Sequence, residues 1–269
     1  MPDFLSLFSY SFMQRALCVG LLGAPSAALL GVTLVLRRFS MIGDGLSHVG
    51  FGALAMALAL DAAPLPVALP IVVLAAFCLL RLRENGTLHG DAAIALVSSS
   101  AIALGVVITS LAGGMSTDVY DLMFGSILAM ENTDLFLSLF LSAAVLFVFL
   151  FCYRKIFAIT FDADFAHTAG VPVRFYTVLI AFLTAVTIVV GMRIMGAMLI
   201  SSLIIFPALT SMQVFKSFRA VTISAAILSV CTFTIGLFAS FWFSLPTGAS
   251  IVLVNLIFFL IFGLIKKVH

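Results

Sequence analysis

The sequence alternates apolar runs of about 20 residues with short polar breaks along its whole length. A run of this length crosses the hydrocarbon core of a bilayer as one α-helix. The pattern predicts an all-α integral membrane protein, a polytopic bundle of about eight or nine transmembrane helices. The expected spans are 16–36, 42–60, 65–82, 92–112, 135–153, 173–191, 194–214, 220–243 and 249–265.

The composition excludes an ordinary soluble domain. Hydrophobic residues make up 64% of the chain and charged residues 9%, whereas soluble domains carry about 25% charged residues. We therefore expect one transmembrane domain over residues 1–269, with the lipid bilayer as its solvent and no nucleic acid as a partner. No GxxxxGK[ST] phosphate-binding loop occurs in the sequence, so any ATP that drives the protein would bind to another chain.

The basic residues gather at alternate breaks between the apolar runs. This pattern places 11 of the 13 lysines and arginines on one side, which the positive-inside rule assigns to the cytoplasm. The chain should then start outside and end inside. The inner set comprises Arg37, Arg38, Arg81, Arg83, Arg154, Lys155, Arg174, Lys216, Arg219, Lys266 and Lys267.

Two connections are longer than simple turns. Residues 113–134 should face outward and contain an apolar middle that is too short to span, which is typical of a half-helix packed on the bundle. The same loop carries four carboxylates that could attract cations, although an ordinary solvated loop explains them equally well. They are Asp118, Asp121, Glu131 and Asp134.

The second long connection, residues 154–172, should face the cytoplasm. Asp162 can cap a short helix that runs through Ala169, with Gly170 at its end and Pro172 just beyond. A mere connection between two spans needs no such helix. We interpret it as a docking element.

Asp44 and His48 are the most unusual residues of the chain, because they interrupt an apolar span. Their i, i+4 spacing places them on one helix face, about 9 Å and about 15 Å beyond Arg38. An unpaired carboxylate at mid-membrane costs at least about 2.5 kcal/mol. A divalent ion such as zinc, manganese or iron(II) would offset that cost. A hydrogen-bonded structural pair and a proton relay are the alternatives.

Pro207 interrupts the apolar run "LIIFPALTS" and predicts a break or kink in that helix. Neighbouring hydroxyl groups could satisfy the backbone carbonyl that a proline leaves unbonded. A kinked helix is a candidate for a gating element, but kinks without function are common. The nearby hydroxyl residues are Ser201, Ser202, Thr210 and Ser211.

Five segments, in order, resemble the metal-transporting ABC-3 family of permeases from bacterial ABC importers. They are "LVLRRFSMIGDGLSHVGFGALAMAL", "GDAAIALVSSSAIALGVV", "DLMFGSILAMENTD", "FDADFAHTAGVPV" and "GMRIMGAMLISSLIIFPALTS", which together cover about residues 30–215. The chain departs from the family at Gly45 and Phe51, near which the family usually has alanine or proline.

The resemblance implies a permease in the bacterial plasma (inner) membrane that pairs with a second copy of itself. It also implies an ABC ATPase subunit at the inner face and an extracytoplasmic metal-binding protein outside. Asp44 and His48 would line the metal pathway, with Asp121 as a further candidate. The inner segment with Asp162, Asp164, Ala166 and Gly170 would be the coupling helix to the ATPase.

Two other classes of protein remain as alternatives. An ion- or proton-coupled secondary transporter would work without an ATPase and would not need the inner helix. A membrane enzyme would need a paired nucleophile and base, which the sequence does not suggest. For the permease we expect no permanently bound cofactor, ATP on the partner subunit, and zinc as the transported metal, with manganese or iron as alternatives.

Overall fold

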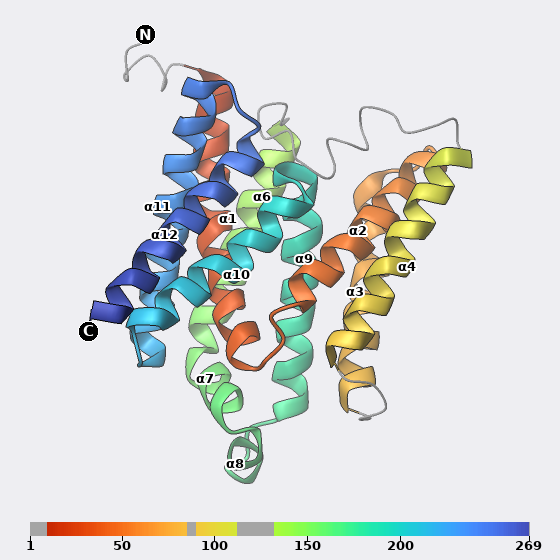
Figure 1. Ribbon diagram of the computed structural model, residues 1–269. Helices are drawn as coiled ribbons and strands as arrows, with labels where there is room; N and C mark the ends of the chain where they lie inside the picture. The colour runs from red at the N-terminus through yellow and green to blue at the C-terminus, as the bar shows by residue number, and fades with distance from the viewer. Residues whose placement is uncertain (1–9, 85–89, 112–131, 269) are drawn as a thin grey trace.

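The computed structural model describes residues 10–84, 90–111 and 132–268, and within these ranges the chain forms helices and no strands (Figure 1). The helices are α1 (Ser11–Leu36), α2 (Ile42–Ala59), α3 (Pro64–Glu84), α4 (Gly90–Leu111), α6 (Asn132–Phe151), α7 (Tyr153–Phe161), α8 (Ala163–Thr168), α9 (Val173–Met195), α10 (Ala197–Val214), α11 (Phe218–Phe243) and α12 (Thr247–Val268).

Eight of these helices are long and apolar enough to cross a membrane, and a bent pair of helices makes a ninth if it counts as one span. The helical, multi-pass membrane fold expected from the apolar runs is confirmed. Most boundaries lie within a few residues of the expected ones. The largest shift at a helix start is in α1, which begins at Ser11 because the apolar pattern continues toward the N-terminus.

The expected loop after residue 153 is wrong in its first half. The chain bends by 70° at Cys152 and then continues as α7. Ile156 and Ile159 lie on one face of α7 and are buried. On a neighbouring face, Tyr153, Phe157 and Phe161 place their rings 5.3–5.9 Å from the ring of Phe218 in α11. Because these apolar side chains pack against the bundle, the segment forms a helix although Arg154 and Lys155 lie in its first turn.

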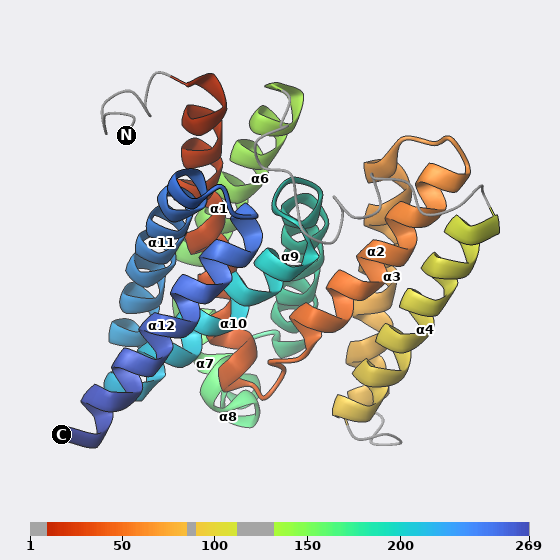
Figure 2. The same cartoon turned by 45° about the horizontal axis from the view of Figure 1, so that its top comes forward.

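The helices form two groups that meet around α9. Helices α2, α3 and α4 pack on one another, while α1, α10, α11 and α12 make the second group and α6 lies against α1. Helix α9 contacts members of both groups, and α2 also crosses α10 (Figures 1 and 2). Helix α2 thus reaches from the first group into the centre of the molecule.

Glycines allow the closest helix crossings. A Cβ atom on Gly31 of α1 would overlap the backbone carbonyl of Ile204 in α10. A Cβ atom on Gly52 of α2 would lie 2.6 Å from the carbonyl oxygen of Ala101 in α4. Small residues let membrane helices approach until their backbones touch. The position of α2 and of α10 therefore depends on these crossings.

We predict that Gly31→Ala lowers the thermal stability of the purified protein. The new Cβ atom would meet backbone, which cannot turn aside, and overpacking of this kind costs about 1–3 kcal/mol. Gly23→Ala on the same helix is the matched control, because its Cβ atom would lie 3.3 Å from the flexible end of Met195. The measurement is the unfolding temperature in detergent. Equal unfolding temperatures for both variants would contradict this account of the crossing.

Candidate functional site

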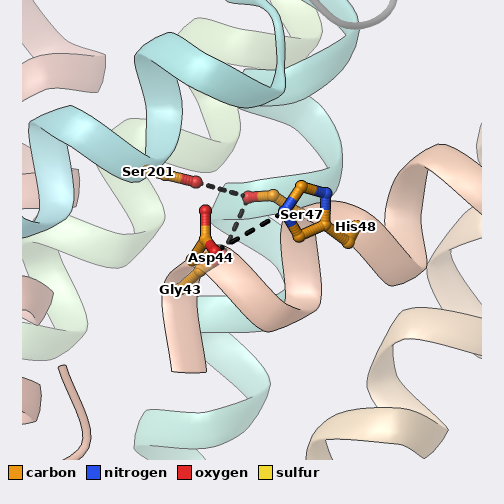
Figure 3. Close-up of polar contacts among 5 residues, drawn as sticks. All are labelled: Gly43, Asp44, Ser47, His48 and Ser201. Carbon is orange, nitrogen blue, oxygen red and sulfur yellow. Dashed lines mark hydrogen bonds and ion pairs between the residues drawn. The ribbon is translucent and has the colours of Figure 1, made fainter. Parts of the chain in front are cut away.

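Asp44 and His48 lie side by side at the start of α2. Asp44 is in the first turn and His48 follows one turn later, with 3.5 Å between His48 Nε2 and Asp44 Oδ2 (Figure 3). The expected shared helix face is confirmed. The first turn also favours a carboxylate, because the helix dipole stabilises negative charge there.

The pair is open to its surroundings in the single chain. Asp44 is 44% exposed and His48 29% exposed, measured over their side chains. Within the described part of the chain, no group of three or more His, Cys, Asp or Glu side chains lies close enough together to hold a metal ion. One chain thus offers two ligands, which is fewer than the four of a closed structural zinc site.

Ser47 fixes the start of α2 to α10. Its hydroxyl donates to the carbonyl oxygen of Gly43 at 2.8 Å and shares a hydrogen bond of 2.9 Å with the hydroxyl of Ser201 (Figure 3). Both serines are buried. The bond between α2 and α10 holds the turn that carries Asp44 and His48. Sequence reasoning missed this role of Ser47, because its partner lies 154 residues away.

Two glycines bring neighbouring helices close to the pair. A Cβ atom on Gly43 would lie 3.4 Å from the side chain of Ile204 in α10, and one on Gly45 would lie 2.6 Å from the side chain of Ile94 in α4. An alanine at Gly45 would therefore require Ile94 to move. Phe51, the second position where the chain departs from the family pattern, is buried against Gly105 of α4.

Pro207 does not break its helix. Helix α10 continues through this buried residue from Ala197 to Val214, so the expected break is wrong, and a kink at Pro207 stays a prediction. The hydroxyls of Ser201 and Ser202 bond to Ser47 and to the carbonyl of Leu199. The sharp change of direction lies instead at Gly196, between α9 and α10, where φ is 86°. A gating role for Pro207 stays a prediction.

The short inner helix α8 is confirmed, with defined caps at both ends. Asp162 Oδ1 accepts a hydrogen bond of 2.8 Å from the backbone N–H of Phe165. At the other end, Gly170 has a φ of 81°, and the N–H of Val171 donates to the carbonyl of Ala166. Each of these bonds satisfies a backbone group that the helix itself leaves unbonded at that end.

Helix α8 lies at one extreme of the molecule, beyond the ends of α7 and α9 (Figure 1). Its Ala166 is buried in the core and Asp162, Asp164 and Gly170 are exposed. Phe165 is 67% exposed. Sequence reasoning missed this exposed ring, although an aromatic residue in a short polar helix can indicate a contact surface. Asp121, the remaining candidate, lies outside the described residues.

Comparison with known proteins assigns the chain to a family. The model of the ABC 3 transport family matches residues 9–266. The manganese import system permease protein ScaB of Streptococcus gordonii is 29% identical over 95% of this chain and 91% of its own length. The chelated iron transport system membrane protein YfeD of Yersinia pestis is 29% identical over 94% of this chain and 85% of its own.

A solved structure has the same fold. PsaBC from Streptococcus pneumoniae in complex with Fab is similar with a TM-score of 0.85 and 30% sequence identity, over 96% of this chain and 92% of that one. The likeness extends over nearly all of the helices described above. The protein is therefore a multi-pass membrane permease that belongs to the ABC 3 transport family.

Proposed function

We propose that this permease carries a divalent transition metal ion into the cell as the membrane subunit of an ABC importer. The observation that carries the proposal is the half-exposed pair of Asp44 and His48 at the start of α2. A pair with only a structural role would be expected to be buried with its hydrogen bonds satisfied, whereas both side chains of this pair are partly exposed. A transported ion must bind and leave again, so an incomplete set of ligands suits its passage.

We propose manganese or iron(II) as the transported metal and rank both ahead of zinc. Carboxylate and imidazole accept all three ions, and zinc was the choice from the sequence because raw affinity favours it. The names of the relatives above refer to manganese and to chelated iron. Among the described residues, no cysteine joins Asp44 and His48 in a group that would favour zinc over manganese.

A second copy of the chain is proposed to complete the site. Two copies related by a twofold axis present the same face to each other, so two Asp44–His48 pairs would provide four ligands. The exposure of the pair in the single chain leaves room for such an arrangement. An extracytoplasmic metal-binding protein would deliver the ion from outside, as the sequence resemblance implies.

Helix α8 is proposed to dock on a separate ATPase subunit at the inner face. A helix of six residues is marginal alone, and the Asp162 cap with the Gly170 turn gives it a fixed shape. The exposed ring of Phe165 is an apolar anchor of the kind that dominates protein interfaces. A secondary transporter, the alternative from the sequence, would have no use for this element.

We predict that Asp44→Asn and His48→Gln each lower metal uptake more than about tenfold. Loss of a residue that only supports a metal ligand already costs about tenfold or more, and loss of a ligand should cost more. Uptake of labelled manganese, with zinc and iron(II) as competitors, is measured in cells that lack their own importers and express the ATPase and binding protein. Asp61→Asn, an exposed carboxylate after the end of α2, is the matched control. Normal uptake by the Asp44 and His48 variants would make the pair structural.

We predict that Phe165→Ala weakens the association with the ATPase and lowers uptake, because an interface anchor is lost. Co-purification of a tagged ATPase with the permease measures the association. Phe215→Ala, in the turn between α10 and α11 and 38% exposed, is the control and should keep the ATPase. Uptake that persists in cells without the ATPase would overturn the importer and favour a secondary transporter.

A further inference from the structure

A groove lies between α3 and α9, at the end of the bundle that carries the inner set of basic residues. Its volume is 610 Å³, which is within the range of small-molecule sites. Four apolar side chains form most of its wall, namely Phe77, Leu80, Phe175 and Val178. Arg81, Arg174 and Thr177 form the rest.

The polar part of the groove is positively charged. Arg81 and Arg174 are exposed, and neither makes an ion pair with a side chain that the structure describes. The hydroxyl of Thr177 accepts a hydrogen bond of 3.2 Å from Arg37, which brings a third guanidinium beside the groove. Among the described residues that line the groove, none is a carboxylate that could neutralise Arg81 and Arg174. Two open guanidinium groups match the oxygens of a phosphate, which arginine can bind through paired hydrogen bonds.

The apolar part of the groove is open as well. Phe175 is 59% exposed and Val178 is 40% exposed. A soluble anion would use the arginines and leave these side chains uncovered. A molecule with an anionic head and a hydrocarbon tail would use both parts together. The order of the two parts suits a lipid. Arg81 and Arg174 lie at the ends of two candidate membrane spans, Pro64–Leu82 and Val173–Met195, and Phe77 lies one turn farther inside its span.

We propose that this groove binds an anionic phospholipid of the inner leaflet. The phosphate lies between Arg81 and Arg174, and an acyl chain follows Phe77, Phe175 and Val178. Basic pockets between transmembrane helices on the cytoplasmic side bind anionic head groups by the same combination of charge and apolar contact. The proposal is independent of the transported metal and of the Asp44–His48 pair.

The test is native mass spectrometry of the full-length permease in detergent with added phosphatidylglycerol or phosphatidylcholine of identical acyl chains. The wild-type protein is expected to retain phosphatidylglycerol preferentially. The double variant Arg81→Gln/Arg174→Gln should lose this preference, by about fivefold for each arginine removed. Arg81→Lys/Arg174→Lys keeps the charge and should keep part of the preference, which separates a lost site from a damaged fold.

The matched control is Lys266→Gln/Lys267→Gln, which removes two basic residues of the last turn of α12, away from the groove. This control should bind lipid as the wild-type protein does. Equal retention of the two lipids by the wild-type protein, or equal losses in groove and control variants, would overturn the proposal. Unchanged lipid selectivity together with lost ATPase co-purification in the groove variant would overturn it too, because the groove would then be a protein contact.

Discussion

Ile204 of α10 is the point on which the arrangement of the central helices depends. Its backbone carbonyl lies where a Cβ atom of Gly31 in α1 would be, and its side chain lies against Gly43 of α2. Two glycines from two helices thus fit around one isoleucine. Since lipid tails are as apolar as the helices, packing of this closeness rather than a hydrophobic effect holds membrane helices together.

The crossing of α2 and α10 also explains how the chain keeps a carboxylate and an imidazole within an apolar span. The buried hydrogen bond between Ser47 and Ser201 holds one face of α2 to α10. Asp44 and His48 are adjacent to Ser47 in the same turns, yet they remain partly exposed. A carboxylate at this depth is costly unless it is paired. The imidazole of His48 lies 3.5 Å from the carboxylate and lowers that cost, while both side chains stay partly exposed.

The sequence predicts the features that depend on local order and misses those that depend on distant contacts. The spans follow from the length of the apolar runs, and α8 follows from Asp162 and Gly170, because caps are local chemistry. The bonding of Ser47 to Ser201 joins residues that no local pattern relates. Helix α7 was missed for the same reason, since its basic start resembles a loop and its burial of Ile156 and Ile159 depends on tertiary packing.

Helix α9 connects α8 to the centre of the bundle. It starts just after α8, at Val173, and runs for 23 residues, about 34 Å, to Met195. Near its far end Met192 packs on Gly50 of α2, and Gly196 turns the chain directly into α10. Helix α9 therefore contacts both α2 and α10. These are the two helices that the Ser47–Ser201 bond joins beside Asp44 and His48.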